Sequence, residues 1–256
     1  MALASSSRLA NVDVRVPPAS PRRAARAHAP RARAVVAMAG PPMPSRALGH
    51  VIQGDDASAV RLEFWLDYAC PFSGRFWRHV RSGAAKYGNK VQLVCYHQVQ
   101  PWHFQSTLAH EVALAFCRVK GEGAFVSFSD ALFDADTQSA CMTDVEVENK
   151  TKMDIYDSLI EVGRKAGGSL RVTDEDEVKV REILGLDAAA LKRGEKNPGN
   201  LVTQELKFYI KLGRQTGVHV SPSTYLHGLA VDSSSSWRDD EWHEFFDRHL
   251  AAAAAN

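Results

Sequence analysis

The sequence has no Cys-x-x-Cys pair, because its four cysteines, Cys70, Cys95, Cys117 and Cys141, stand far apart along the chain. Disulfide scaffolds and zinc ribbons are built on closely spaced cysteines, so the sequence argues against both classes. No apolar run approaches the roughly 18 to 20 residues needed to cross a bilayer, which excludes an integral membrane protein. A hydrophobic content of 45% is ordinary for a globular chain. We therefore expect a soluble globular protein.

Acidic residues are nearly absent from the first 47 positions, which hold eight arginines and one acid, Asp13. This segment opens Met-Ala-Leu-Ala-Ser-Ser-Ser and is rich in Arg, Ala, Ser and Pro. Such a composition is typical of an organelle transit peptide. The Ala- and Ser-rich opening favours a chloroplast over a mitochondrion. A basic arm that binds RNA or a membrane surface is the alternative. We predict a transit peptide over residues 1–40, and neither a nucleic acid nor a membrane as partner.

Strand-forming residues fill 60–66 and 91–97, and Phe76, Trp77 and Val80 recur between them at helical spacing. Proline directly after Cys70 suits the first turn of that helix. Two strands joined by a helix form a βαβ unit whose strands lie parallel. The first strand is therefore expected to lead directly into a helix at Cys70.

The second half of the pattern begins after a long helical region, about 105–199, in which no strand signal appears. A helix over 201–212 follows, then strands over 217–228 and 229–231 joined by a turn at Gly228. An amphipathic helix then runs from about Ser236 to Leu250. The expected order is β-α-β, helical insertion, α-β-β-α. We place one domain over 58–250, with a linker at 41–57 and a tail at 251–256.

This order resembles the DsbA-like branch of the thioredoxin superfamily. Cys70 stands at the first strand-to-helix junction, and Gly-Val-x-x-Ser-Pro-Ser, residues 217–223, stands before the third strand. The resemblance covers about 58–250 and implies an α/β thioredoxin-like fold, a central mixed sheet with a large helical insertion. In that family the second motif, Gly-Val-x-x-Thr-Pro-Thr, contains a cis-proline. It implies a cis bond at Pro222, which costs little for a prolyl bond, and places the backbone of Ser221 beside Cys70.

The first motif departs from the family pattern Cys-Pro-x-Cys, because Ser73 stands where the resolving cysteine would be. The buried acid of many relatives aligns with Phe64, and Glu63 would point to the opposite face of the strand. Ordinary intramolecular dithiol exchange is therefore not expected. A cysteine at a helix N-terminus still faces free N–H groups and the positive end of the helix dipole, which favour the thiolate. The Ser73 hydroxyl could donate a further hydrogen bond to the sulfur of Cys70.

We predict a monothiol thiol-disulfide oxidoreductase with Cys70 and Ser73 as catalytic residues, because a mixed disulfide at a lone cysteine persists until an external thiol attacks it. The predicted substrate-binding residues are Ser221, Pro222, Pro71, Phe72 and Trp102. No bound cofactor is expected. The expected partner is a disulfide- or thiol-containing peptide, or glutathione, which would act as a cosubstrate.

Two other functions stay open. The motif Asp67-x-x-Cys70-Pro71-x-Ser73 is also similar to Asp-x-x-Ser-Pro-Tyr-Ser in kappa-class glutathione transferases and hydroxychromene-carboxylate isomerases. In those enzymes the first serine, here Cys70, stabilises the glutathione thiolate. The loss of both the second cysteine and the buried acid also fits a thioredoxin-fold protein that only binds peptides or a partner.

The remaining candidates are weaker. His97, His103 and His110, with Cys95 nearby, match no standard zinc spacing, so no metal site is predicted. The loop after the second strand leaves at the end where a thioredoxin-type site opens, so Trp102 or His103 would line the substrate groove, with core packing of Trp102 as the alternative.

The other cysteines have simpler expected roles. Cys95 and Cys117 are expected in the core. Cys141, expected in a polar loop, is the one distant residue that could resolve a disulfide at Cys70.

Overall fold

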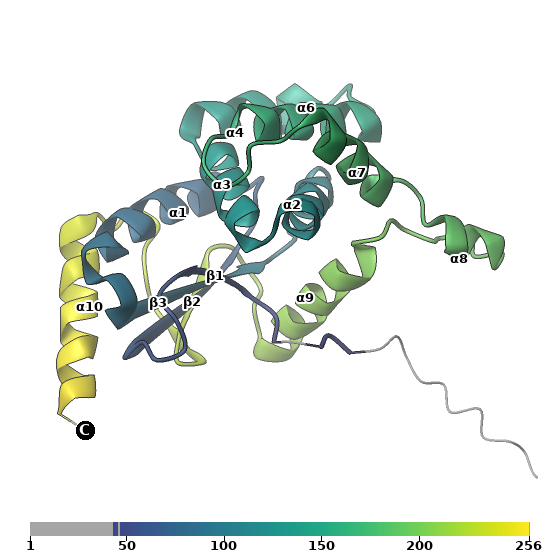
Figure 1. Cartoon of the computed structure of the whole chain (residues 1–256). Helices are drawn as coiled ribbons and strands as arrows, with labels where there is room; N and C mark the ends of the chain where they lie inside the picture. Colours follow the sequence, from purple (N-terminus) through teal and green to yellow (C-terminus); the bar gives the residue numbers. More distant parts are fainter. Residues whose placement is uncertain (1–42, 46, 256) are drawn as a thin grey trace, which may run out of the picture. The chain divides into compact units, whose positions relative to one another are not determined.

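The computed structural model describes residues 43–45 and 47–255. The predicted transit peptide, 1–40, lies outside the described residues. The described part is built on a mixed five-stranded sheet, with strands in the order β1-β3-β2-β4-β5 (Figure 1). The strands are β1 His50–Gln53, β2 Val60–Leu66, β3 Val91–His97, β4 Ser223–Leu226 and β5 Leu229–Val231. As predicted, β2 and β3 are parallel, and the other neighbouring strands are antiparallel.

Helices surround this sheet. The helix that follows β2 is α1 Pro71–Ala84, and a short 3₁₀ helix, Ala85–Lys90, leads from it to β3. The insertion between β3 and β4 contains α2 Ser106–Lys120, α3 Glu122–Leu132, α4 Ala135–Met142, α5 Asp144–Val147, α6 Lys152–Lys165, α7 Asp174–Leu184 and α8 Ala188–Lys192. It is followed by α9 Thr203–Thr216, and the chain ends in α10 Asp239–Ala254. The predicted helical insertion over 105–199 is therefore present.

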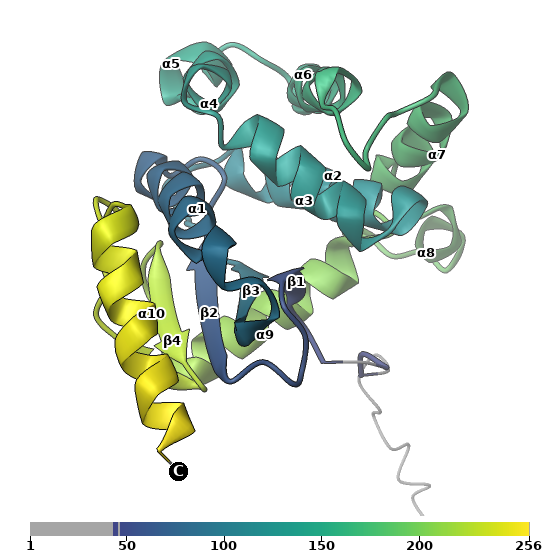
Figure 2. The ribbon, with the colours of Figure 1, turned by 60° about the vertical axis from the view of Figure 1, so that its left-hand side comes forward.

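The two faces of the sheet are covered by different helices, because alternate side chains of a strand point to opposite faces. Leu62 and Phe64 of β2 belong to the larger core cluster, which α1 and α10 share. Trp65 belongs to a second cluster, formed with residues of α9. Figure 2 shows α1 and α10 side by side in front of the sheet and α9 behind it. This packing fixes the start of α1 at the carboxyl end of β2.

The strand β1 was not predicted, and it lies within the range assigned to a linker, 41–57. It pairs antiparallel with β3, with His50 opposite Cys95. Its four residues stand between two glycines with positive φ, Gly49 at 117° and Gly54 at 72°. Four residues are too few to show a strand pattern in the sequence, and the pairing partner is distant along the chain.

Three element boundaries differ from prediction. The predicted strand over 217–228 begins only at Ser223, because Gly217 is left-handed and the chain bends before Pro222. Helix α9 starts and ends later than the predicted 201–212. Helix α10 starts at Asp239 and continues into the predicted tail, since its last residues are alanines, the best helix formers. In the described part, no helix combines the length and apolar character that a membrane crossing requires.

Candidate active site

Cys70 is the N-cap of α1, with extended backbone angles of φ −80° and ψ 118°. Its carbonyl accepts the amide of Ser73 at 3.0 Å and that of Gly74 at 3.2 Å, which closes the first helical turn. Pro71 opens the helix, where its missing N–H costs nothing. The residue is 6% exposed. The sulfur therefore stands at the positive end of a helix of 14 residues, with only a small part open to solvent.

The loop before β4 lies directly against this cysteine. The peptide bond between Ser221 and Pro222 is cis. The Cys70 thiol donates to the Ser221 carbonyl oxygen, with Sγ and O 3.5 Å apart. Ser221 Oγ is buried and has no hydrogen-bond partner among the described residues. The structure therefore brings together the two motifs, which lie about 150 residues apart in the sequence.

Ser73 is fully buried, and its hydroxyl has a different partner from the one that the sequence suggested. Ser73 Oγ accepts the backbone N–H of Asp67 at 3.2 Å. In the described part of the chain, no hydrogen bond joins it to the sulfur of Cys70. Ser73 therefore links the start of α1 to the residue that follows β2. It positions the turn that carries Cys70 and does not hydrogen-bond the sulfur.

Asp67 is the polar centre of the site and is fully buried. Its Oδ1 accepts the Ala69 amide at 2.9 Å and the Ser106 hydroxyl at 2.7 Å. Its Oδ2 accepts the Gln100 amide at 3.2 Å and hydrogen-bonds His103 Nδ1 at 2.9 Å. One carboxylate thus holds three segments together: the turn before Cys70, the loop after β3 and the first turn of α2.

A chain of buried histidines continues from this carboxylate across the molecule. His110 Nε2 lies 3.8 Å from Asp67 Oδ1, and His110 Nδ1 is 2.6 Å from His97 Nδ1. His97 Nε2 is 3.0 Å from His50 Nε2, and His50 Nδ1 is 2.7 Å from Glu122 Oε2. Spacing in the sequence groups His97 with His110 but does not reveal the chain, since its members come from β1, β3, α2 and α3.

Burial keeps the inner histidines uncharged. Desolvation lowers the pKa of His110 to about 4, and the pKa of His97 is held well below its usual range by burial and by the neighbouring rings. His97 and His110 are therefore neutral near pH 7. Cys95, the cysteine beside them in the sequence, donates to the Tyr96 carbonyl at 3.9 Å.

Gln138 of α4 supports the backbone on the other side of Cys70. Its Nε2 donates to the carbonyl of Tyr68 at 2.7 Å and to that of Cys70 at 3.1 Å. Gly74 makes this approach possible, because a Cβ at that position would collide with Oε1 of Gln138. The helical insertion therefore takes part in shaping the cysteine's surroundings.

Large apolar side chains are exposed on the segments that surround Cys70. Phe72 is 53% exposed and Trp102 61%, and Phe104 and Val220 are also largely exposed. Trp102 therefore does not pack in the core, the alternative considered from the sequence. Phe72 lies two residues after Cys70, Trp102 and Phe104 flank His103, and Val220 precedes the cis bond, so all four belong to segments that meet at the site. Exposed aromatic groups of this kind favour contact with a partner or substrate.

Cys95 and Cys141 are poor partners for Cys70. Among the described residues, no disulfide joins any two cysteines. Cys141 lies in α4 instead of the predicted polar loop, and it is buried. Its thiol donates to the Thr137 carbonyl at 3.0 Å, and burial raises its pKa to about 11. Burial also raises the pKa of Cys95. At neutral pH neither thiol is ionised enough to resolve a mixed disulfide quickly.

No protein-family model matches the sequence, and no curated protein matches it. Solved structures do resemble the fold. One is a proposed protein-disulfide isomerase from Pseudomonas syringae, with a TM-score of 0.53 and 21% identity over 74% of this chain and 94% of that one. Another is oxidised BdbD from Bacillus subtilis, with a TM-score of 0.54 and 16% identity over 79% and 93%. A third is reduced DsbG, a disulfide bond oxidoreductase from Mycobacterium tuberculosis, with a TM-score of 0.50 and 15% identity over 81% and 93%.

These likenesses define the fold. The chain has a thioredoxin fold with a helical insertion. More particularly, it is the DsbA-like form of that fold, as the sequence predicted. The TM-scores of 0.50 to 0.54 show a shared fold, and at identities of 15–21% they show the fold alone.

Proposed function

We propose that the protein is a monothiol thiol-disulfide oxidoreductase that acts through Cys70. The observation that carries the proposal is the position of Cys70 Sγ, at the N-terminus of α1 and 3.5 Å from the Ser221 carbonyl in the cis-proline loop. A sulfur at this place faces the N–H groups of the first helical turn and the positive end of the helix dipole. The proposed protein-disulfide isomerase and the disulfide bond oxidoreductase of the same fold support this choice of chemistry.

The reaction would proceed in two exchanges. The Cys70 thiolate attacks one sulfur of a substrate disulfide, forms a mixed disulfide and releases the other substrate sulfur as a thiolate. Glutathione, as an external thiolate, then attacks the substrate sulfur of the mixed disulfide and restores the Cys70 thiolate. In the net reaction, the substrate disulfide and glutathione give a substrate–glutathione mixed disulfide and a free substrate thiol. An external thiol is needed because Ser73 replaces the second cysteine, and because the thiol of Cys141 is bonded to the Thr137 carbonyl and has its pKa raised to about 11.

The substrate would be an extended peptide or glutathione lying along the cis-proline loop. Ser221 would offer its backbone and its unpartnered Oγ, next to Pro222. The exposed Phe72 and Trp102 would contact apolar side chains of the peptide. Pro71 is also exposed at the site. The glutathione-transferase alternative uses the same residues. The observation that keeps it as second candidate is the unpartnered Ser221 Oγ, which would contact glutathione.

The test is a comparison of Cys70→Ser with Cys141→Ser in the full chain. The substrate is a glutathionylated peptide with excess glutathione, and release of the peptide thiol is followed. We expect Cys70→Ser to lose at least about 100-fold in rate, since it lacks the nucleophile, and Cys141→Ser to keep the wild-type rate. A Cys70→Ser protein that exchanges as fast as wild type would overturn the proposal.

A second assay separates the alternatives. The same proteins are given glutathione and 1-chloro-2,4-dinitrobenzene, an electrophile without a disulfide. Conjugation that depends on Cys70, together with no disulfide exchange, would assign the transferase instead. If the protein is inactive in both assays and its Cys70→Ser variant still binds peptide, the remaining function is that of a protein that only binds peptides or a partner.

A further inference from the structure

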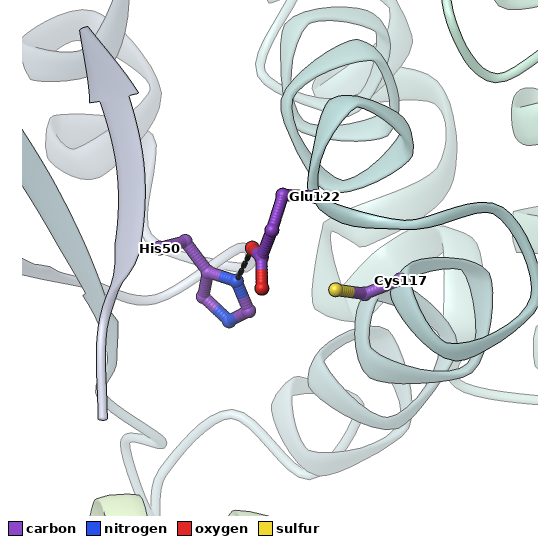
Figure 3. Close-up of side chains that lie close together, drawn as sticks. All are labelled: His50, Cys117 and Glu122. Atoms are coloured by element: carbon purple, nitrogen blue, oxygen red, sulfur yellow. Dashed lines mark hydrogen bonds and ion pairs between the residues drawn. The ribbon is translucent and has the colours of Figure 1, made fainter. Parts of the chain in front are cut away.

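We propose that His50, Cys117 and Glu122 form a binding site for a thiophilic divalent cation, and that this cation is Zn²⁺. The imidazole, thiol and carboxylate point toward one another (Figure 3), and one ligand atom from each lies within 4.8 Å of the others. The site is separate from Cys70 and does not depend on the proposed function. It comes from three different elements, so spacing in the sequence does not reveal it.

The local backbone brings the two helical ligands together. Cys117 lies in the last turn of α2, and Glu122 is the first residue of α3. Gly121 between the helices has a φ of 86°, a left-handed value that favours glycine, and its amide closes α2 on the Cys117 carbonyl at 2.7 Å. This sharp turn places the Glu122 carboxylate beside Cys117. His50, the first residue of β1, faces it from the sheet.

His50 is held in the orientation that a metal ligand needs. Its Nε2 is hydrogen-bonded with Tyr209 Oη at 3.1 Å and His97 Nε2 at 3.0 Å. Its ring stacks on Phe125, with the ring centres 3.7 Å apart and the planes at 10°. The other ring nitrogen, Nδ1, is thus directed at Glu122 Oε2, to which it is hydrogen-bonded at 2.7 Å. Histidines that bind metals usually have their second nitrogen engaged in this way, which fixes the ring.

The donor set selects the kind of ion. One nitrogen, one sulfur and one oxygen suit Zn²⁺, while Mg²⁺ and Ca²⁺ prefer oxygen ligands alone. A thiolate and a carboxylate together neutralise a divalent charge. Three protein ligands leave a fourth tetrahedral position for water or an added ligand.

The side chains can reach such an arrangement. The Glu122 side chain is 37% exposed and Cys117 is partly exposed, so the ion can reach the site from solvent and Glu122 can rotate. Ligand atoms of a tetrahedral zinc site lie closer together than 4.8 Å, so binding would draw them in by about 1 Å. The hydrogen bond between His50 and Glu122 would be exchanged for two bonds to the ion.

Binding would join the sheet to the helical insertion, because β1 supplies one ligand and the α2–α3 junction supplies two. An ion that binds only the folded chain stabilises it by mass action. We therefore expect Zn²⁺ to raise the melting temperature of the full chain, and to do so less when a ligand is removed.

The experiment measures Zn²⁺ and Co²⁺ binding to the metal-free full chain. All proteins carry Cys70→Ser, so that the site cysteine does not compete. We expect one equivalent of metal per chain, and a thiolate-to-cobalt charge-transfer absorption for the Co²⁺ form. Cys117→Ala should abolish that absorption and weaken binding by at least about 100-fold, and Glu122→Gln should weaken it by about tenfold or more.

The matched controls are Cys141→Ala, which removes another cysteine, and Glu161→Gln, which removes another half-exposed glutamate. Both should bind as the parent does. Binding unchanged by Cys117→Ala, or a Co²⁺ spectrum without thiolate absorption, would overturn the proposal.

A second measurement needs no substitution, and it decides the question if a variant fails to fold. In the wild-type full chain, saturating Zn²⁺ should slow the alkylation of Cys117 by iodoacetamide at least about tenfold relative to protein in EDTA, because a coordinated thiolate is a weaker nucleophile. Peptide mass spectrometry reads each cysteine separately. An alkylation rate of Cys117 that Zn²⁺ leaves unchanged would overturn the assignment.

Discussion

At the scale of single residues, the site depends on a carboxylate that does not touch the sulfur. Asp67 receives four hydrogen bonds, two at each oxygen. Two of the donors are backbone amides, those of Ala69 and Gln100. A buried carboxylate with this many donors organises its surroundings strongly, because each hydrogen bond to a charged acceptor is worth more than a neutral one. The conformation of the turn that carries Cys70 therefore depends on the hydrogen bonds of Asp67.

Asp67→Asn tests this role. Whichever way the new amide turns, its NH₂ faces a backbone N–H, that of Ala69 or that of Gln100, so at least one hydrogen bond is lost and the charge of the acceptor is lost with it. We expect the free energy of unfolding to fall by about 2–4 kcal/mol and the thiol-exchange rate to fall about tenfold. Urea unfolding and the glutathionylated-peptide assay measure these effects. The control is Asp232→Asn at an exposed position, and an Asp67→Asn protein as stable as that control would refute the argument.

At the scale of elements, α1 and α4 meet at the site through one glycine. Gly74 leaves the space into which the Gln138 side chain reaches, and Gln138 donates to the Cys70 carbonyl at the start of α1. Replacing a helical glycine by alanine normally stabilises a protein, by about 0.4–1 kcal/mol. A loss of stability at this position would therefore identify the close approach as its cause.

We expect Gly74→Ala to destabilise the protein by about 1–2 kcal/mol, because the added methyl group displaces Gln138 from two carbonyls. Truncating Gln138 makes room for that methyl group. The double variant Gly74→Ala/Gln138→Ala should therefore be more stable than the two single effects predict by addition. Chemical unfolding of the four proteins gives the coupling energy. Strict additivity would show that the two side chains do not interact.

At the scale of the whole molecule, the buried histidines link folding to pH. The folded pKa of His110 is about 4, while an unfolded histidine titrates near 6.5. Below pH 6.5 the unfolded chain therefore binds a proton that the folded chain does not, and protonation favours unfolding. The stability contributed by the neutral ring is fully present above pH 6.5 and is lost as the pH falls to about 4.

Melting temperatures between pH 7 and pH 4, measured with EDTA present, test this link. A depression of the pKa from 6.5 to about 4 corresponds to a loss on the order of 3 kcal/mol, or roughly 5–10 °C for a domain of this size. His110→Gln cannot titrate, so its melting temperature should depend less on pH over this range. The same slope in both proteins would show that another group is responsible.

The sequence by itself determined the βαβ unit, the helical insertion and the place of Cys70 at a helix start. These follow from local patterns: β-branched and aromatic runs for β2 and β3, helical spacing after Pro71, and two short motifs that resemble the DsbA-like fold. Asp67 belongs to one of those motifs, but nothing in the sequence predicted that it would accept four hydrogen bonds. Local patterns record what each segment prefers, and they carry no information on which distant segments meet.

Only the tertiary structure decided the contacts among residues from different elements. β1 forms by pairing with the edge of β3. Its first residue, His50, then lies between His97 and Glu122. The turn at Gly121 brings Cys117 to the same place. The fold likewise put Cys141 in α4 against expectation, where its thiol donates to the Thr137 carbonyl and its pKa is raised to about 11. Such groupings arise from chain folding that brings together residues tens of positions apart, and for that reason they appear only in three dimensions.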